Sequence, residues 1–281
     1  MRNYAEMIVK EINEKHENLS AEIVDITKMN DEKLVGVMIK KGDSMGGSVH
    51  YVREYHVENM SVEECAAHFV SNMRDESEVP LADKEEITWD DVKDNITMRL
   101  INTEYNEEYL KDKVRKDLGN GFTIMFDVTT DVANIAVTKS FADSLGCDDL
   151  TLTLAAQYSR AGEPVLRDMA EALFANEPTN LLEGEKTSRS GMFVLTTANE
   201  HFGASAIYRG GVGDRIKEVV GDYYLLPSSV HEWIVVPKDS GIEVRALKKM
   251  VEDANASVVE RCDLLAYGVY EWTARGVKKV A

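Results

Sequence analysis

Residues 21–55 read AEIVDITKMNDEKLVGVMIKKGDSMGGSVHYVREY, and they carry the strongest structural signal in the chain. Three runs rich in β-branched residues, 21–28, 33–41 and 48–55, are separated by the polar connections 29–32 and 42–47. Short runs of this kind, bounded by turn residues, are typical of β-strands. Because connections this short join neighbouring strands, the segment predicts a three-stranded antiparallel meander.

Helical signals lie on both sides of this meander. Residues 4–16 place apolar side chains at helical spacing, which predicts an opening amphipathic helix. Ser61 is followed three positions later by Glu64, the spacing of a capping box, so a second helix is expected to begin there. We therefore expect an N-terminal α+β subdomain over residues 1–74, made of a helix, a meander and a helix.

The rest of the chain predicts a larger mixed part. An acidic, polar stretch that contains Pro80, residues 75–95, is expected to connect the subdomain to a second domain over residues 96–281, in which residues 177–191 predict a mobile loop. Strands are expected at 96–104, 122–130, 191–197, 223–229, 232–239 and 263–276, and helices at 106–119, 148–162, 164–177 and from Ile242 onward. Since strands and helices do not alternate one for one, the sequence favours the α+β class, with a mainly antiparallel sheet, over a doubly wound parallel sheet.

Composition and charge argue against several classes of protein. The 281 residues contain 32 Lys plus Arg against 50 Asp plus Glu, a net charge of −18. Such an excess of acids repels nucleic acid and anionic lipid on average. No run of 18 apolar residues could span a membrane, and residues 1–20 lack the uninterrupted apolar region of a secretory signal. We expect a soluble, acidic, cytoplasmic protein with no nucleic-acid or membrane partner; the oligomeric state stays open.

Metal and disulfide chemistry find little support in the sequence. The three cysteines, Cys65, Cys147 and Cys262, are far apart and odd in number, which is typical of small buried side chains. The six histidines show no His-x-x-x-His or His-Glu-x-x-His spacing, and no Cys-x-x-Cys occurs. The loop residues 199–201 (Asn-Glu-His) could bind a ligand, although a solvated loop is the simpler interpretation. We expect no metal and no cofactor.

A first candidate nucleophile is Ser44, in the sequence Gly42-Asp43-Ser44. The context resembles that of trypsin-like proteases and of one lipase and esterase family, but the partners that a serine nucleophile needs are missing. Only His16 precedes the serine, and the position three residues before the last histidine, His231, is a serine and not an aspartate. We interpret the glycines here as turn residues between two strands.

A second candidate site lies in LLPSSVHEWIVVP, residues 225–237. Four residues that could carry hydrolase chemistry fall within five positions: Ser228, Ser229, His231 and Glu232. Closeness in sequence does not make a triad, because the side chains must also converge in space. The alternative is a Pro-Ser-Ser turn between two strands, in which the serines bond to the backbone and His231 supports the turn.

A third candidate is the glycine-rich segment that precedes residues 215–222. Gly210, Gly211 and Gly213 stand before a helix, which is how phosphate cradles are built. The Walker lysine is absent, the third position of a dinucleotide fingerprint falls on Ile216, and Asp214 would repel a phosphate. A connection with Asp214 as the helix N-cap is the simpler interpretation.

Four segments together resemble a known but uncharacterised family: FTIMFDVTT (122–130), AVTKSFADSLG (136–146), MFVLTT (192–197) and DYYLLPSSVHEWIVVP (222–237). The sequence resembles a domain-of-unknown-function family found in gut Clostridia and other Firmicutes. The resemblance runs over most of the chain and is strongest at residues 190–240. It implies a bacterial cytoplasmic protein, and it supplies no catalytic residue.

Two hypotheses of different class follow. The first is an interaction or regulatory protein without catalytic activity, which binds a protein partner. The second is a hydrolase or small-ligand enzyme with Ser228, Ser229, His231 and Glu232 in or near its site. The second requires these side chains to meet in a pocket.

Overall fold

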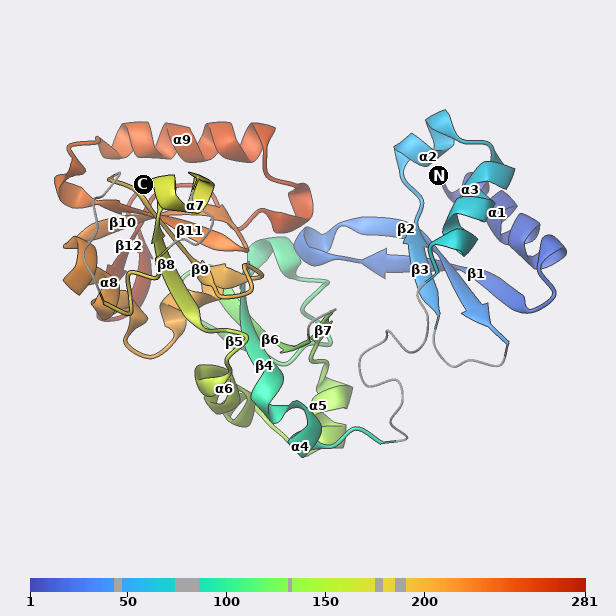
Figure 1. The fold of residues 1–281 in the computed structure, drawn as a ribbon, viewed down its shortest axis with the longest axis horizontal. Helices are drawn as coiled ribbons and strands as arrows, with labels where there is room; N and C mark the ends of the chain where they lie inside the picture. The colour runs from blue at the N-terminus through green and yellow to red at the C-terminus, as the bar shows by residue number, and fades with distance from the viewer. Residues whose placement is uncertain (43–46, 74–85, 131–132, 175–178, 185–190) are drawn as a thin grey trace. The chain divides into compact units, whose positions relative to one another are not determined.

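The computed structural model describes residues 1–42, 47–73, 86–130, 133–174, 179–184 and 191–281 (Figure 1). The chain divides into two compact units, Met1–Glu85 and Glu86–Ala281, which we call the N-terminal and C-terminal units. Most of the expected connection, the tip of the Gly-Asp-Ser turn and most of the expected mobile loop lie outside the described residues.

The N-terminal unit packs helices against a small sheet, as the sequence predicts. Its elements are α1 (Arg2–Lys15), β1 (Leu19–Thr27), η1 (Met29–Asp31), β2 (Lys33–Lys41), β3 (Ser48–Tyr51), α2 (Glu54–Asn59) and α3 (Val62–Ser71). The strands form one antiparallel sheet in the order β1-β2-β3, so the predicted meander is confirmed. Its core buries Ile8 and Ile12 of α1 against Val37 and Ile39 of β2.

Two local predictions in this unit have different outcomes. The capping box is confirmed, because the Ser61 hydroxyl accepts the Glu64 N–H at 3.2 Å and the Glu64 carboxylate accepts the Ser61 N–H at 2.8 Å. The third strand is shorter than expected: it ends at Tyr51, and residues 54–59 form α2. Asp43 and Ser44 lie outside the described residues, while β2 and β3 on either side of them pair antiparallel.

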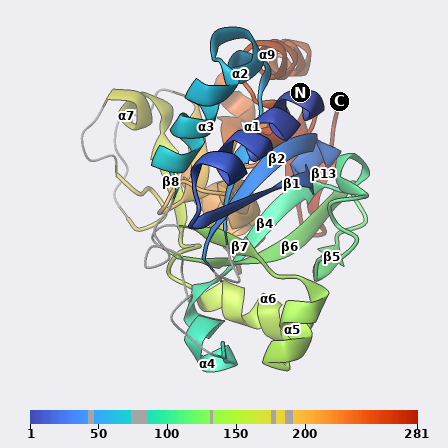
Figure 2. The same cartoon turned by 90° about the vertical axis from the view of Figure 1, so that its right-hand side faces the viewer.

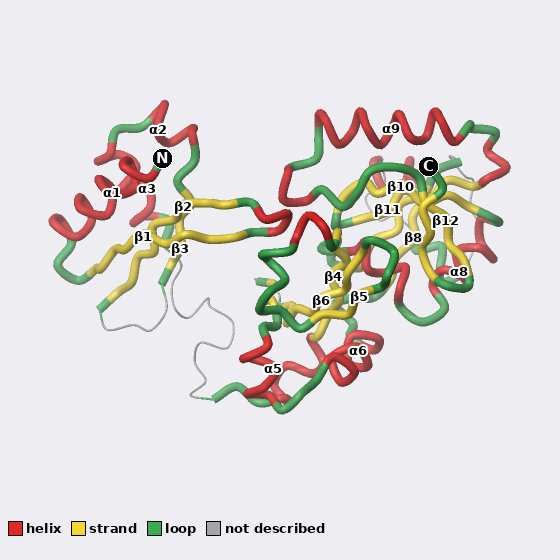
Figure 3. The backbone as a smooth tube through the Cα atoms, turned by 180° about the vertical axis from the view of Figure 1, so that it is seen from behind, coloured by secondary structure: helices red, strands yellow, loops and turns green. Residues whose placement is uncertain are grey.

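The C-terminal unit contains two antiparallel sheets (Figures 1 and 3). The smaller holds β4 (Ile96–Asn102), β5 (Arg115–Asp117), β6 (Phe122–Thr129) and β7 (Asn134–Ala136). The larger has the order β13-β12-β10-β11-β9-β8, built from β8 (Pro164–Asp168), β9 (Phe193–Thr197), β10 (Tyr223–Ser229), β11 (Glu232–Pro237), β12 (Tyr270–Thr273) and β13 (Gly276–Lys279). Every described strand pair is antiparallel, so the chain is an α+β protein.

Helices and short 3₁₀ turns surround these sheets. They are α4 (Trp89–Val92), η3 (Lys93–Asn95), η4 (Glu104–Asn106), α5 (Lys139–Leu145), α6 (Asp149–Tyr158), α7 (Met169–Phe174), η5 (Gly203–Tyr208), α8 (Val212–Val220), η6 (Lys238–Ser240), α9 (Val244–Ser257) and η7 (Arg261–Asp263). Within this unit, Figures 1 and 2 place α5 and α6 on the side of β4 and β6 that is remote from α9. Helix α6 packs on β4 and η3.

An aromatic cluster joins the two sheets of the C-terminal unit. The ring of Trp233 on β11 meets that of Phe122 on β6 edge-on, with centroids 5.9 Å apart, and both rings contact Tyr270 on β12. The Trp233 indole N–H donates to the carbonyl of Ala204 at 2.8 Å, so its one polar group is satisfied in the core. Elements far apart in sequence are thereby held together around the middle of the unit.

Three sequence predictions in this unit are wrong. Residues 106–119 were expected to form a helix but form turns followed by β5, because Lys116 pairs with Ile124 of β6. Residues 164–177 were expected to form a helix, but Pro164 opens the edge strand β8, a position that tolerates proline, and only α7 follows. Residues 263–276 were expected to form one strand, but η7 and a loop precede β12.

Candidate functional site

The turn at residues 228–232 closes the hairpin between β10 and β11. This geometry agrees with the interpretation of the segment as a turn between two strands. The Ser228 hydroxyl donates to the Glu232 carboxylate at 2.9 Å, and the Ser229 hydroxyl accepts the His231 N–H at 3.0 Å. The turn therefore uses both hydroxyls to hold its own backbone and side chains.

The imidazole of His231 is occupied at both nitrogens. Its Nδ1 accepts the backbone N–H of Phe202 at 3.1 Å, and its Nε2 lies 3.4 Å from a carboxylate oxygen of Asp263. Since Nδ1 accepts, the neutral ring carries its proton on Nε2 and directs it at Asp263. Such a ring has no free nitrogen to take a proton from a serine, so the segment is not arranged as a nucleophile and its base.

A buried ion pair lies next to this histidine. Arg99 on β4 donates from Nε and Nη2 to both carboxylate oxygens of Asp127 on β6, at 2.8 and 2.6 Å. Nη1 lies 3.3 Å from the hydroxyl of Tyr109, and the guanidinium lies 3.5 Å from the centre of the Phe202 ring. That ring is in turn stacked on His231, with centroids 5.1 Å apart. These contacts tie the smaller sheet to the hairpin.

Burial and ion pairing act in opposite directions on the pKa of the Asp127 carboxyl. Loss of solvent raises the pKa of the Asp127 carboxyl, and the Arg99 guanidinium opposes that rise. Burial also raises the pKa of the Tyr109 hydroxyl. The bidentate geometry is that of an ionised carboxylate on a guanidinium, so we take Asp127 as charged at neutral pH.

The turn that carries Phe202 is built from strained and tightly packed residues. Glu200 and Phe202 have left-handed backbones, with φ of 59° and 52°. A Cβ on Gly203 would lie 2.3 Å from the Thr196 hydroxyl and 2.5 Å from the His231 carbonyl, so only glycine fits there. Strain of this kind persists only where the surrounding structure fixes the backbone, and it is concentrated at functional sites.

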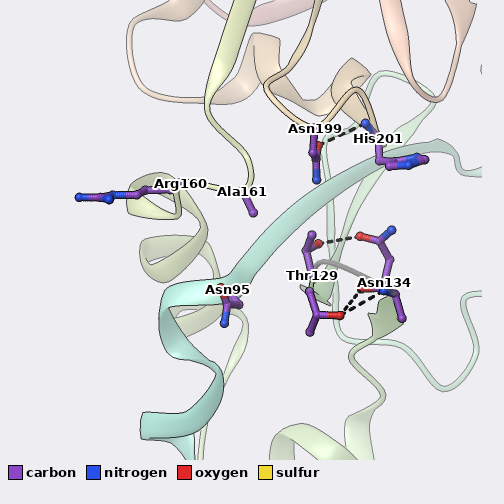
Figure 4. A pocket seen from close by; sticks show the side chains of 9 residues that line it. Asn95, Thr129, Asn134, Arg160, Ala161, Asn199 and His201 are labelled. Atoms are coloured by element: carbon purple, nitrogen blue, oxygen red, sulfur yellow. Dashed lines mark hydrogen bonds between the residues drawn. The ribbon is translucent and has the colours of Figure 1, made fainter. Parts of the chain in front are cut away.

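A polar pocket of about 940 Å³ opens beside this turn (Figure 4). Its polar lining consists of Asn95, Thr129, Thr130, Asn134, Asn199 and His201, with Arg160 at the rim. Volumes of this order hold small molecules. We call this cavity the polar pocket.

A second cavity, of about 690 Å³, adjoins the polar pocket and shares Asn95 and Arg160 with it. Its large apolar side chains are Trp89 of α4 and Leu154 and Tyr158 of α6. Lys93, Asp94, Ala155 and Ser159 complete its lining. We call this cavity the apolar groove. Leu154 and Tyr158 are 54% and 84% exposed, and Leu150, one turn earlier on the same helix, is 62% exposed.

Helix α6 presents this face because its own sequence has two apolar sides. Asp148 caps the helix, as expected, by accepting the Thr151 N–H at 2.8 Å. Leu152 and Ala156 are buried, while Leu150, Leu154 and Tyr158 recur every fourth residue on an exposed face. A surface helix that packs against its own protein on one face usually carries polar residues on the opposite face.

Among the described residues, one group has donor atoms close enough to share a metal ion. Glu260, Cys262 and Asp263 hold a ligand atom each within 4.8 Å of one another. They are near neighbours in and beside η7, so their closeness follows from local sequence. At the glycine-rich segment, the prediction of Asp214 as the helix N-cap is wrong. Gly211 is the N-cap of α8, with a φ of 76°, and Asp214 lies inside the first turn and accepts a hydrogen bond from the Trp272 indole.

Comparison with known proteins gives the family of the chain. A family model described as a family of unknown function, DUF5688, matches residues 1–274. The chain belongs to this family. No curated protein and no solved structure matches it. Among the described residues, no helix is long and apolar enough to cross a membrane.

Sequence reasoning missed most of these two cavities. The polar pocket is lined by four separate segments, near residues 95, 129–134, 160 and 199–201. Of these, the sequence indicates only residues 199–201, as a loop that could bind a ligand. The apolar groove had a visible signal, since Leu150, Leu154 and Tyr158 extend the apolar pattern of α6 beyond one face.

Proposed function

We propose that this member of the family is a cytoplasmic interaction protein without catalytic activity, which binds a short segment of a partner protein in the apolar groove. The observation that carries the proposal is the exposed face of α6. Three large apolar side chains, Leu150, Leu154 and Tyr158, stand on it in one row. Single exposed leucines are normal, but a contiguous apolar row beside a groove is typical of a protein-binding surface.

The size of the face favours a short segment over a second copy of the chain. Three side chains and part of the Trp89 indole offer on the order of a few hundred Å². A stable interface between two folded proteins buries roughly 800 Å² on each partner. One extended or helical segment with one or two large apolar side chains matches the available surface.

Charge around the groove indicates what the partner segment carries. Two charged residues lie at one side: Asp94, and Lys93, which is paired with Asp90 at 2.6 Å. The Arg160 side chain is exposed and forms no ion pair with a described residue, in a protein with a net charge of −18. An acidic residue beside the apolar anchor of the partner would pair with Arg160. We infer a segment that combines a large apolar residue with an adjacent Asp or Glu.

The alternative of a hydrolase or small-ligand enzyme at residues 225–233 has less support. It would need a serine hydroxyl within reach of a free imidazole nitrogen. The Ser228 hydroxyl bonds to Glu232, and the His231 ring bonds to Phe202 and Asp263. These contacts favour a structural role for the turn.

Selection of peptides from a random displayed library on the purified protein tests the proposal. The protein should enrich sequences that pair a large apolar residue with an acid. Binding of the selected peptide should weaken at least tenfold in Leu154→Ala and Tyr158→Ala. The matched controls are Leu173→Ala and Phe174→Ala on α7, since these residues are 69% and 85% exposed but lie away from the groove.

Three outcomes would count against the proposal. The library could enrich nothing, or the selected peptides could bind the Leu154→Ala and control variants equally well. A concentration-dependent dimer, seen by light scattering and dissociated by Leu154→Asp, would show that a second copy covers the face.

A further inference from the structure

We propose that the polar pocket is a binding site for a small organic oxyanion, a carboxylate or a phosphate ester. This site is separate from the partner segment in the apolar groove, although the two cavities meet at Asn95 and Arg160. The inference rests on the pocket's volume, on which hydrogen-bonding groups its lining leaves free, and on the charges that surround it.

The side chains that line the pocket come from fixed positions on the scaffold. Thr129 ends β6 and Asn134 begins β7, and these two residues pair across the strands. Asn199 and His201 follow β9 in the strained turn, where Arg167 pairs with Glu200. A pocket whose walls are held in this way needs little reorganisation to bind a ligand.

Two carboxamides in the pocket have their oxygens occupied and their nitrogens free. Asn134 Oδ1 accepts the Thr129 hydroxyl at 2.7 Å, and Thr129 in turn pairs with the buried Thr97 hydroxyl at 2.7 Å. Asn199 Oδ1 accepts the Thr197 hydroxyl at 2.8 Å and the His201 N–H at 3.2 Å. Neither Nδ2 donates to a described residue. In Figure 4 the Nδ2 of Asn199 points toward Thr129, across the pocket.

Free N–H donors with occupied acceptors select for a ligand rich in oxygen acceptors. A sugar or another polyol would bring hydroxyl donors that need acceptor oxygens, and Asn199 Oδ1 already accepts two hydrogen bonds while Asn134 Oδ1 accepts one, so few acceptors remain for it. A carboxylate or phosphate brings acceptor oxygens alone, and hydrogen bonds from N–H groups to such anions are the stronger kind.

The surrounding charge favours an anion as well. Among the described lining residues none is acidic, although the protein carries 50 Asp plus Glu. Arg160 lies on the rim, and Glu200, between Asn199 and His201, has its charge paired with Arg167. The Arg160 side chain points away from Asn199 in Figure 4, so it attracts an anion from a distance and does not fix its position.

Titration of the ¹⁵N-labelled protein tests this directly, because the side-chain NH₂ groups of asparagine give their own signals. The probes are inorganic phosphate and citrate, with ribose and spermidine as the neutral and cationic comparisons. We expect saturable shifts of the Asn134 and Asn199 NH₂ signals with phosphate or citrate and none with the comparison compounds.

Isosteric variants separate the site from a general salt effect. Asn134→Asp and Asn199→Asp keep the accepting oxygen but replace the free donor by a negative charge, so each should weaken oxyanion binding about tenfold or more. Asn3→Asp adds the same charge on α1 of the other unit, at an exposed residue, and should change nothing. Leu154→Ala, which alters the apolar groove, should also leave the titration unchanged.

The proposal is wrong if neither oxyanion shifts the two NH₂ signals. It is equally wrong if ribose binds in their place, or if the Asn3→Asp and Asn199→Asp variants lose affinity to the same extent. Failure of peptide binding in the groove, with the oxyanion titration intact, would overturn the proposed function alone.

Discussion

The guanidinium of Arg99 on β4 lies 3.5 Å from the centre of the Phe202 ring, although Phe202 follows β9 of the other sheet and the two residues are far apart in the chain. Phe202 holds this position with a left-handed backbone, and its N–H donates to His231. A cation on an aromatic face out of solvent contributes about 2 kcal/mol or more. The contact therefore links the buried ion pair to the turn that forms one wall of the polar pocket.

Phe202→Ala should destabilise the C-terminal unit by about 2–4 kcal/mol, because it removes the ring from both Arg99 and His231. The measurement is urea unfolding followed by tryptophan fluorescence, since all three tryptophans, Trp89, Trp233 and Trp272, lie in this unit. Phe174→Ala, at a ring that is largely in solvent, should stay within about 0.5 kcal/mol of the parent protein. Equal effects of the two substitutions would show that the stack contributes nothing.

The ion pair of Arg99 and Asp127 should show strong coupling. Asp127→Asn leaves a buried guanidinium without its counter-charge and should cost about 3–5 kcal/mol of unfolding free energy. The double variant Arg99→Met with Asp127→Leu removes both charges. It should cost much less than the sum of the costs of the single variants Arg99→Met and Asp127→Leu. If the losses of unfolding free energy in this double-mutant cycle were additive, Arg99 and Asp127 would not be coupled, and the prediction would be wrong.

The N-terminal unit should lose stability when the pH falls below about 6.5, the ordinary pKa of histidine. Burial, and then the neighbouring His68, lower the pKa of His50, and burial and His68 likewise lower that of His56. The unfolded chain therefore binds more protons than the folded one in this range. Stability is present above the unfolded pKa and declines as the pH falls toward the lowered folded values.

His50→Phe tests the source of this pH dependence. The His50 ring is stacked on Phe69 with centroids 4.9 Å apart, and its buried Nε2 has no hydrogen-bond partner among the described residues, so a phenyl ring fits the same contact. Amide exchange in β2 and β3 between pH 7.5 and 5.5 should become less pH-dependent in this variant. His201→Gln in the other unit is the control, and it should leave the slope for the N-terminal unit unchanged.

Local sequence signals were sufficient for most of the N-terminal unit, the exception being α2, where a strand was predicted. The amphipathic helix α1, the capping box of Ser61 and Glu64 and the meander all depend on neighbours within a few residues. In the C-terminal unit, distant pairing decided the outcome. Residues 115–117 look helical by their charges, yet they pair with β6, and Pro164 looks like a helix start, yet it opens a strand beside β9.

The candidate sites also differ in whether local sequence is enough to predict them. The exposed face of α6 could be predicted from the spacing of Leu150, Leu154 and Tyr158 alone. The polar pocket could not, because Thr129 and Asn199 meet only after β6 and β9 are placed in their sheets. Conversely, Ser228, Ser229, His231 and Glu232 are close in sequence, but their hydrogen bonds serve the turn.

Site-specific photo-crosslinking tests the central claim most directly. A benzoylphenylalanine is placed at position 158 on α6 or at position 174 on α7, where the native side chains are 84% and 85% exposed. On irradiation in cells of the native host, position 158 should give one discrete adduct with a partner protein. Leu154→Asp should abolish that adduct, and position 174 should give none. No adduct from position 158, or the same adducts from both positions, would contradict the assignment of the apolar groove as the partner-binding surface.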